Sequence, residues 1–369
     1  MTNRPRISLV CFAVNPGFAD YVTGLITSIR SHAFVRVYIG SGLAPELSEL
    51  VGSPYFRFGR TRHLPIDYIK YILSVLWDRP DLLLVQAWIK VPLLESLIIY
   101  LFRAVGIRCS VTIHDVVPHE PTLLNKTGLP FYYKSFTHLI THSNAARDRL
   151  RMMGIRHTID VMPHPLIECY KLGKFTKQSA RKKLNIPETN KFVVLFFGHI
   201  TARKGIFQLV DAVRYLETSL EIKLVVAGAS KLSSNELAQL ERSCSQLDAV
   251  LVNRHIPHSE VELYFEAADC VAMPYLEGTT SGVLKIAMAF GKPVVASSIG
   301  DVAETVGAEA AVIVPLCDFA ESFAAGILQA AKRIRSLEAG VQAARKKLGW
   351  ATIGERYFRS LMDQINIKI

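Results

Sequence analysis

The chain has 369 residues, of which half are hydrophobic and a fifth are charged. This composition excludes a disordered chain, and the length favours two domains over a single hydrophobic core. The six cysteines are scattered, without a CxxC pair or zinc-ligand spacing. We expect them to be reduced thiols, mostly buried, in a cytoplasmic protein.

The net charge of +11 lies in the first half of the chain. Residues 1–190 contain 24 lysines and arginines against 13 acidic residues, whereas residues 191–369 contain 19 of each kind. A basic half can face an anionic membrane, an acidic ligand or nucleic acid, or it can be an ordinary solvated surface. Because no nucleic-acid-binding motif accompanies the charge, we expect no nucleic-acid partner.

The first half alternates apolar runs with amphipathic segments, which predicts a parallel sheet with crossover helices. Residues 18–31 have the periodicity of a helix. The apolar segment 7–14 lacks a cleavage site, so we interpret this segment as a strand and not as a signal peptide. The segment 91–106 is too short to span a membrane and carries Glu95 and Arg103, which favours a buried or interfacial helix. Strands are predicted at 7–14, 34–39, 82–86, 109–114 and 138–141.

A polar, lysine-rich stretch at 165–190 predicts a linker followed by a second doubly wound domain. Its predicted strands are 191–198, 222–229, 250–253, 270–275, 293–297 and 310–315, and its helices 204–216, 234–247, 259–268 and 283–290. The chain ends in an aromatic helix at 349–365. Open parallel sheets bind ligands beyond the carboxyl ends of their strands, so we expect a ligand in the cleft between the two domains.

Two segments of the second domain have the pattern of an anion site. Gly198 ends a strand, and the loop after it leads to Arg203 and Lys204 at a helix start, where amides and cations attract phosphate. The alternative is two exposed basic residues on a loop. The stretch TTSG (279–282) precedes helix 283–290 in the same way, and Ser281 is a candidate N-cap.

A carboxylate, Glu277, precedes the second helix start. It would repel a phosphate but can accept hydrogen bonds from the hydroxyls of a sugar, unless it is simply a solvent-exposed loop acid. The amides of Gly282 and Val283 would point at an anion, and Thr279, Thr280 and Ser281 can donate hydroxyl hydrogen bonds.

The first domain offers fewer candidates. His114 follows a predicted strand, and Asp115 and His119 come soon after it, yet no third ligand cluster appears, so we expect no metal. His142 and Ser143 at another strand end are interpreted as architectural. Gly17 lies in the first strand-to-helix turn, which lacks the G-x-G-x-x-G fingerprint of nicotinamide and flavin enzymes.

Three stretches together resemble the retaining glycosyltransferases of family 4, which have the GT-B architecture. They are GHITARKGIFQLVDAV, PHSEVELYFEAADCVAMPY and EGTTSGVLKIAMAFGKPVVASSIGDVAETV. NPGF, VTIHDVVPHE, THSNAARDRL and MPHPL extend the resemblance more weakly into the first half. The implied fold is α/β, with two Rossmann-like doubly wound domains facing a central cleft. The implied domains are residues 1–167 with the crossover helix 349–369, and residues 168–348.

The resemblance implies transfer of a hexosyl unit from a nucleotide-sugar, such as a UDP- or GDP-sugar, to an acceptor hydroxyl with retention of configuration. No metal or other cofactor is expected. Lys204, aided by Arg203, would neutralise the donor diphosphate, and the amides of Gly282 and Val283, with Thr280 and Ser281, would bind the distal phosphate. Glu277 would hold the donor sugar and His114 would lie by the transferred sugar. Gly17 would approach the phosphates from the other domain.

Two positions depart from the family pattern. Lys285 stands where relatives often have a second glutamate that binds the ribose, and an ammonium cannot accept a hydrogen bond from a ribose hydroxyl. His199 stands where relatives often have an arginine after the glycine of the first loop. His199 and Lys285 are both candidate donor-binding residues: either the ribose is bound by other residues, or Lys285 adds positive charge near the phosphates. Both departures bear on the identity of the donor more than on the class of reaction.

The resemblance also implies that the basic first half binds the acceptor, a glycan or polyprenyl-linked saccharide of surface or exopolysaccharide synthesis. Residues 65–77 and 91–106 are candidates for contact with an anionic membrane, with core packing as the alternative, so we expect a peripheral protein on the cytoplasmic face. Two other functions stay open: a nucleotide-sugar epimerase or hydrolase on the same fold, and a non-catalytic protein that binds sugar nucleotides.

Overall fold

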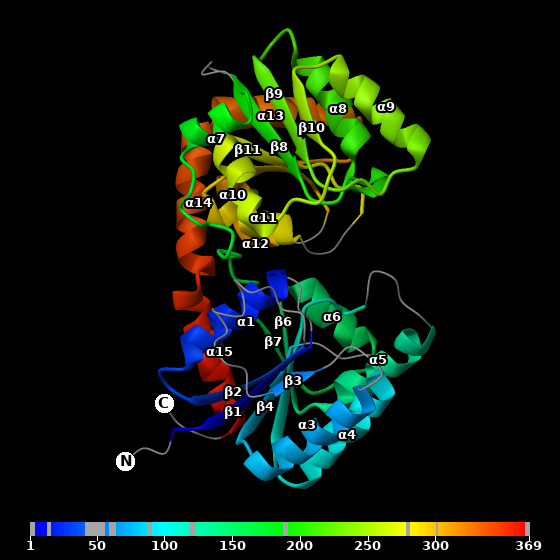
Figure 1. Cartoon of the computed structure of the whole chain (residues 1–369), viewed down its shortest axis with the longest axis vertical. Coiled ribbons are helices and arrows are strands. Elements are labelled where there is room, and N and C mark those ends of the chain that lie inside the picture. Colours follow the sequence, from blue (N-terminus) through cyan, green and yellow to red (C-terminus); the bar gives the residue numbers. More distant parts are fainter. Residues whose placement is uncertain are drawn as a thin grey trace. The chain divides into compact units, whose positions relative to one another are not determined.

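The computed structural model describes residues 4–12, 16–40, 56–58, 64–86, 91–117, 123–186, 191–277, 281–299 and 302–365 (Figure 1). The chain divides into two compact units, which we call the N-terminal unit (residues 1–165 and 348–369) and the C-terminal unit (residues 166–347). The structure therefore assigns residues 166 and 167 to the C-terminal unit and residue 348 to the N-terminal unit, whereas the sequence predicted the opposite assignment for each. Each unit is described by itself below.

The N-terminal unit is built on a seven-stranded parallel sheet in the order β3-β2-β1-β4-β5-β6-β7. Central strands such as β4 are wholly buried and apolar because helices cover both faces of such a sheet. The strands are β1 (Arg6–Cys11), β2 (Phe34–Gly40), β3 (Phe56–Phe58), β4 (Leu82–Val85), β5 (Arg108–Ile113), β6 (His138–Thr141) and β7 (Thr158–Val161).

Six described helices pack on this sheet. The last of them, α15, returns from the end of the chain and packs against α1, where Gly24 and Gly354 permit the contact because a β-carbon on either would overlap Trp350 or Ser28. The helices are α1 (Pro16–Ile29), α3 (Leu64–Asp78), α4 (Pro92–Ala104), α5 (Leu123–Ser135), α6 (Asn144–Met152) and α15 (Trp350–Gln364).

The C-terminal unit has a six-stranded parallel sheet in the order β10-β9-β8-β11-β12-β13. Its strands are β8 (Phe192–Phe197), β9 (Ile222–Ala227), β10 (Ala249–Val252), β11 (Cys270–Met273), β12 (Val294–Ser297) and β13 (Ala311–Val314). Its helices are α7 (Lys177–Lys183), α8 (Ile206–Leu216), α9 (Ser234–Ser245), α10 (His258–Ala267), α11 (Gly282–Ala289), α12 (Val302–Ala310), α13 (Phe319–Lys332) and α14 (Ile334–Leu348), with a 3-10 turn, η1 (Ala202–Lys204), before α8.

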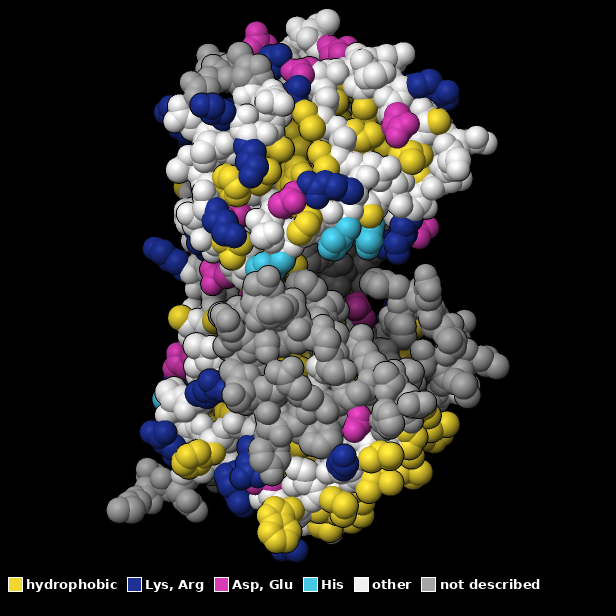
Figure 2. All heavy atoms as spheres, viewed as in Figure 1, with side chains coloured by type: hydrophobic (Ala, Val, Ile, Leu, Met, Phe, Trp, Pro, Cys, Tyr) yellow, Lys and Arg dark blue, Asp and Glu magenta, His cyan; other side chains and the backbone are white. Residues whose placement is uncertain are grey.

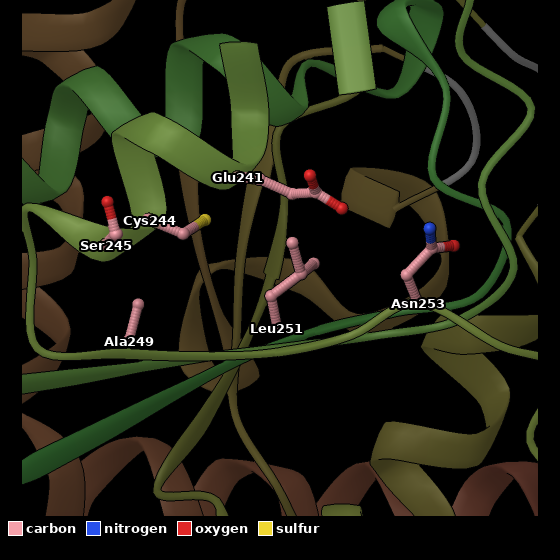
Figure 3. A pocket seen from close by; sticks show the side chains of 6 residues that line it. All are labelled: Glu241, Cys244, Ser245, Ala249, Leu251 and Asn253. Carbon is pink, nitrogen blue, oxygen red and sulfur yellow. The ribbon is translucent and has the colours of Figure 1, made fainter. Parts of the chain in front are cut away.

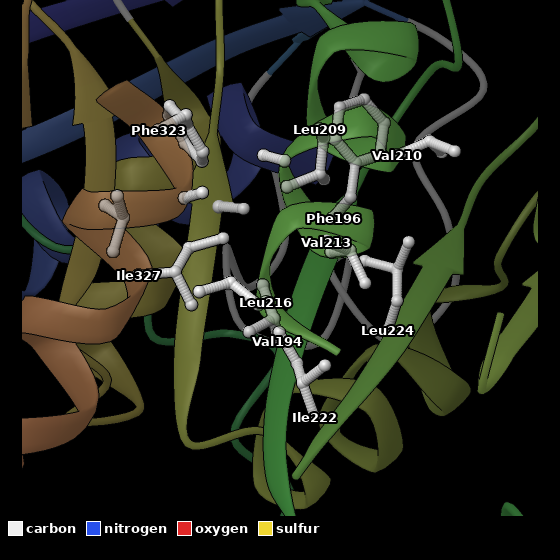
Figure 4. Packing of buried hydrophobic residues seen from close by; sticks show 14 of the residues in the cluster. Val194, Phe196, Leu209, Val210, Val213, Leu216, Ile222, Leu224, Phe323 and Ile327 are labelled. Atoms are coloured by element: carbon white, nitrogen blue, oxygen red, sulfur yellow. The ribbon is translucent and has the colours of Figure 1, made fainter. Parts of the chain in front are cut away.

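Helical periodicity explains the core of this unit. In α8, Ile206, Leu209, Val210 and Val213 recur at intervals of three and four residues, and all are buried. Figure 4 shows this face of α8 against Val194 and Phe196 of β8 and against side chains of α13. The apolar stripe therefore fixes α8 over the strand that ends in Gly198.

The predicted strands and helices are observed with small shifts in their bounds, and two differences bear on the site. The edge strands β3 and β7 were not predicted, because each is short and lies outside the strongly apolar centre of the sheet. The helix expected at 204 begins at Ile206. Arg203 and Lys204 belong to η1, and Gly205 takes a left-handed conformation between η1 and α8. All six cysteines are free, and four of them are buried, as expected.

Candidate functional site

The C-terminal unit places its candidate residues at a topological switch point. The chain order of the sheet reverses between β8 and β11, which are neighbouring strands. The loop with Arg203 and Lys204 follows β8, and the segment from Tyr275 to Ser281 follows β11. Doubly wound sheets bind ligands at the carboxyl ends of strands at this position. The fold thus brings together two segments that lie about seventy residues apart in the sequence.

Lys204 lies at the centre of this arrangement. Its Nζ is 3.0 Å from the position that a β-carbon would occupy on Gly198, and the side chain of Val283 at the start of α11 is 3.7 Å from the same position. The Lys204 Nζ also lies 5.3 Å from the centre of the Tyr275 ring. One ammonium group, one glycine backbone and one helix start therefore share a small region at the sheet edge.

Glycine is required at Gly205 for the loop to reach this position. Its φ is +69°, and a β-carbon there would overlap the carbonyl oxygen of Pro274. The amide of Leu276 also donates to the carbonyl oxygen of Arg203 at 2.9 Å. These two backbone contacts hold the loop after β8 against the segment after β11, and so they fix where Lys204 projects.

The electrostatic state of Lys204 is unusual. Desolvation, and then the positive charge of Arg203, lower the pKa of Lys204 to about 8. A lysine in this state carries a charge that its surroundings do not neutralise, which makes a bound anion favourable. Near-neutral pH leaves most of these lysines protonated, so the region can bind a phosphate.

The N-cap residue of α11 does not cap the helix with its side chain. Ser281 occupies the N-cap position as predicted, but its side chain makes no capping hydrogen bond, and its Oγ lies 3.4 Å from the Tyr275 hydroxyl instead. The first amides of a helix need an acceptor, and a phosphate can supply it. Gly282 and Val283 are the first two residues of α11.

Lys285 has a different environment from the one that a ribose-binding residue would need. Its side chain is 2% exposed, and its Nζ donates to the hydroxyl of Thr305 in α12 at 3.1 Å. This partly buried hydrogen bond joins α11 to α12. The structure therefore gives Lys285 a packing role in the C-terminal unit that the sequence did not suggest.

The remaining candidates of the C-terminal unit lie near its surface. Glu277 is exposed after β11, and His199 is exposed after β8, where partial desolvation followed by the charge of Lys231 lowers its pKa. Thr279 and Thr280 fall outside the described residues, so their predicted roles stay predictions.

The N-terminal unit contains the other two candidates and a cluster that the sequence did not reveal. Gly17 lies in the first turn of α1. His114, His142 and His164 follow β5, β6 and β7, and one nitrogen from each ring lies within 4.8 Å of the others. The expected neighbour His119 falls outside the described residues, whereas His142, expected to be architectural, belongs to the cluster.

His164 was missed because β7 was missed. The sequence shows a histidine just after each of two predicted strands, and MPHPL would have supplied the third once Thr158–Val161 was recognised as a strand. Burial, followed by the nearby rings of His142 and His164, lowers the pKa of His114 well below its usual value. The His114 ring therefore favours the neutral state.

A separate depression of about 330 Å³ lies between α9 and β10. Figure 3 shows its lining, which includes Glu241 and Cys244 of α9, Leu251 of β10, and Asn253. None of the residues predicted from the sequence lines it, so we do not assign the candidate site to this depression.

Comparisons with known proteins bear on the family and on the fold. Residues 191–333 match the family described as Glycosyl transferases group 1, so the resemblance to glycosyltransferases is confirmed for this segment. A D-inositol 3-phosphate glycosyltransferase of Xylanimonas cellulosilytica is 31% identical over 182 residues, covering 47% of this chain and 42% of that protein. The chain thus spans less than half the length of this curated relative.

Solved structures confirm the GT-B fold across nearly the whole chain. Anabaena HepE in complex with UDP has a TM-score of 0.76 at 18% identity, with 97% of this chain and 100% of that chain covered. The UDP-GlcNAc 2-epimerase of Neisseria meningitidis, bound to UDP-GlcNAc, has a TM-score of 0.68 at 13% identity, with 97% and 100% covered. At these identities the likeness establishes the fold alone.

Proposed function

We propose that this protein is a retaining glycosyltransferase that moves a hexosyl unit from a nucleotide-sugar to a hydroxyl group of a saccharide acceptor. The observation that carries the proposal is the position of Lys204 beside Gly198 and the start of α11, at the switch point of the C-terminal sheet. Group 1 glycosyl transferases are the family that the same segment matches.

The donor in this proposal is a UDP- or GDP-sugar. Its diphosphate binds to the Lys204 ammonium, with Arg203 nearby, and to the amides of Gly282 and Val283. HepE and the epimerase named above were both solved with uridine nucleotides, which favours a UDP-sugar among the candidates. Glu277, exposed after β11, accepts hydrogen bonds from the hydroxyls of the donor sugar.

The chemical step follows from the charge on the leaving group. Breaking the bond between the sugar and the diphosphate increases negative charge on the departing oxygen, and fixed positive groups lower the energy of that transition state. In this proposal Lys204 and the helix amides supply the stabilisation without a metal ion at the diphosphate. In this proposal His114 lies by the transferred sugar, and Gly17 lies near the phosphates.

Two measurements on matched variants test the donor site. Thermal shifts with UDP-, GDP- and ADP-sugars should show one nucleotide class stabilising the protein, since a ligand that binds only the native state raises its melting temperature. Lys204→Gln should weaken both the nucleotide and the nucleotide-sugar. Glu277→Gln should weaken only the nucleotide-sugar. If Glu277→Gln weakens the free nucleotide equally, the assignment of Glu277 to the sugar is wrong.

The acceptor in this proposal is a lipid-linked saccharide used in polysaccharide synthesis, and the supporting observation is an exposed apolar face on the N-terminal unit. Figure 2 shows hydrophobic side chains gathered over α3 and α4. The buried Glu95 of α4 accepts a hydrogen bond from Tyr68 of α3 at 3.1 Å, so the two helices present one surface. Its members, each 42–88% exposed, are Ile66, Ile69, Leu73, Trp77, Leu93, Leu94, Leu97, Tyr100 and Leu101.

A contiguous apolar surface of this kind marks an interaction site more often than a free surface. The half of the chain that bears it also carries the whole excess of positive charge, which matches an anionic bilayer. Among the described helices none is long and apolar enough to cross a membrane. We therefore propose peripheral attachment to the cytoplasmic leaflet through this face.

Vesicle sedimentation tests the attachment. The protein should bind vesicles of phosphatidylglycerol and bind neutral phosphatidylcholine at least tenfold more weakly. The double variant Leu73→Glu with Leu97→Glu should lose most of the binding, whereas Leu316→Glu, an exposed leucine of the C-terminal unit, should leave it unchanged. Equal binding of the double variant and the control would refute this face as the contact.

An epimerase or hydrolase is the second candidate, favoured by the shared fold of the Neisseria epimerase. Incubation with a nucleotide-sugar alone separates the candidates. A transferase should consume it only when an acceptor is present, apart from slow hydrolysis. Rapid turnover without acceptor would replace the proposed function with the alternative. Binding without any turnover would favour a non-catalytic role.

A further inference from the structure

The carboxyl ends of three neighbouring strands each deliver a histidine to one place in the N-terminal unit. His114 directly follows β5, His142 directly follows β6, and His164 lies three residues after β7. One nitrogen of each ring lies within 4.8 Å of those of the other two. His142 is buried and the other two are partly buried, so the cluster has a side that solvent can reach.

Hydrogen bonds determine which nitrogen of each ring carries the proton. His142 Nδ1 lies 3.0 Å from the carbonyl oxygen of Met162, and His164 Nδ1 lies 2.7 Å from that of Pro165. His114 Nε2 lies 3.3 Å from Oε1 of Gln86. Because these oxygens can only accept, each of these nitrogens donates. In neutral rings the lone pairs are therefore on His142 Nε2, His164 Nε2 and His114 Nδ1.

Two of these lone pairs face each other. His142 Nε2 and His114 Nδ1 are 3.3 Å apart, and neither has a proton to share in this arrangement. A cation between them would remove the repulsion. A metal ion would satisfy both lone pairs at once.

The spacing of His114 and His142 suits a transition metal, and His164, whose nitrogen lies within 4.8 Å of theirs, would have to move closer to bind the same ion. With zinc–nitrogen bonds of about 2.0–2.1 Å in a tetrahedral site, two ligand nitrogens lie about 3.3–3.4 Å apart, which is the separation of the His114 and His142 nitrogens. Metal-bound histidines usually donate their other ring N–H to an oxygen acceptor that fixes the ring's orientation, and Met162, Pro165 and Gln86 supply such acceptors here. Imidazole suits zinc, copper, iron and nickel, and does not suit magnesium.

Aromatic packing holds the rings in place. The Tyr21 ring lies edge-on to all three, with centroid distances of 4.6 Å to His114, 5.6 Å to His142 and 5.2 Å to His164. Phe18 packs on the His114 ring at 4.5 Å. A ligand set that is already ordered loses less conformational entropy on binding an ion.

We propose that His114, His142 and His164 form a binding site for one divalent transition-metal ion, with zinc as the best-fitting ion. Three protein ligands leave one coordination position open to water or to an oxygen of a ligand. This site lies wholly within the N-terminal unit, and the inference does not rest on the proposed function. It stands against the sequence expectation of a metal-free protein, which considered Asp115 and His119 as the partners of His114.

The competing arrangement needs no metal. If the Gln86 amide is turned over, its NH2 group donates to His114 Nε2, His114 Nδ1 donates to His142 Nε2, and His142 Nδ1 donates to Met162. Gln86→Glu separates the two arrangements because a carboxylate can accept from His114 but cannot donate to it. Metal binding should survive Gln86→Glu, whereas the metal-free relay would lose its first donor.

Cobalt titration of the full chain tests the proposal, with any histidine tag removed and the protein first stripped with EDTA. We expect one Co²⁺ per chain with the visible absorption of a tetrahedral site, displaced by Zn²⁺. His142→Gln and His164→Gln should each weaken binding at least tenfold, since even removal of a second-shell partner costs about 10–100-fold. His157→Gln, in the same unit with its Nε2 on the Lys134 carbonyl, is the control and should bind normally.

Thermal unfolding of each variant checks its folding. If the buried His142→Gln does not fold, the partly buried His164→Gln still decides the question. Failure of the folded wild-type chain to bind Co²⁺ or Zn²⁺ would overturn the proposal and leave the metal-free relay. Binding that is equal in wild type, His164→Gln and His157→Gln would also overturn it. Neither result would bear on nucleotide binding in the C-terminal unit.

Discussion

The lowered pKa of Lys204 makes the affinity for a nucleoside diphosphate depend on pH in a way that an ordinary lysine would not. Desolvation and Arg203 place this pKa at about 8, against an ordinary value of 10.5. Because only the protonated amine attracts the diphosphate, binding is strong below this pKa and weakens as the pH rises through it. An unperturbed lysine would stay charged over the same range.

The size of the effect follows from the fraction of protonated lysine. With a pKa of about 8, about nine-tenths of the Lys204 side chains are charged at pH 7 and about one-tenth at pH 9. The dissociation constant of UDP should therefore rise about tenfold between these values, or about 1.4 kcal/mol. The terminal phosphate of UDP loses its last proton near pH 6, so the charge of the diphosphate stays constant between pH 7 and 9.

Isothermal titration calorimetry with UDP at pH 7, 8 and 9 measures this directly. Lys204→Gln should bind UDP about 10–100-fold more weakly at pH 7, because a charged hydrogen bond is lost. Its dissociation constant for UDP should not rise between pH 7 and 9. Lys204→Arg keeps its charge at every pH, so its affinity should also be flat. A constant affinity for the wild type, or the same tenfold rise in both variants, would refute the reasoning.

Two further predictions concern the loops that position this lysine. Gly205→Ala should destabilise the protein by about 2–4 kcal/mol in urea unfolding, because its φ of +69° and the carbonyl of Pro274 both exclude a β-carbon, whereas Gly106→Ala, with a φ of +91° in open space, should cost only about 1 kcal/mol. A similar loss for both would show that the carbonyl contact is unimportant. Ser281→Ala should change stability by less than about 0.5 kcal/mol because Ser281 makes no capping bond, while Ser233→Ala removes the observed capping box of α9 and should cost about 1 kcal/mol. UDP affinity should fall in Ser281→Ala and not in Ser233→Ala, and the opposite order would remove Ser281 from the phosphate site.

Local patterns in the sequence were sufficient for most of the fold. Buried strands of a parallel sheet are continuous apolar runs, and covering helices repeat their apolar residues every three or four positions, so elements such as β6 and α8 could be located directly. The anion-binding loop and the start of α11 were visible for the same reason, since glycine, hydroxyl and basic residues at a strand-to-helix junction form a local pattern.

Edge elements and contacts between distant segments could not be predicted in this way. A short edge strand such as β7 buries little apolar surface, so its sequence carries a weak signal, and without it His164 had no place in the sheet. Lys285 looked like part of the phosphate site because sequence spacing gives only its position on α11. The partner that it binds, Thr305, comes from another helix.

The sequence by itself determined which residues end strands and which begin helices, because backbone geometry and burial repeat over a few residues. Only the tertiary structure decided which of those ends meet. The order of parallel strands is set by the packing of crossover helices on both faces of the sheet, and that order brings the loop after β8 beside the segment after β11. The same physics brings His114, His142 and His164 together after three consecutive strands of the other sheet.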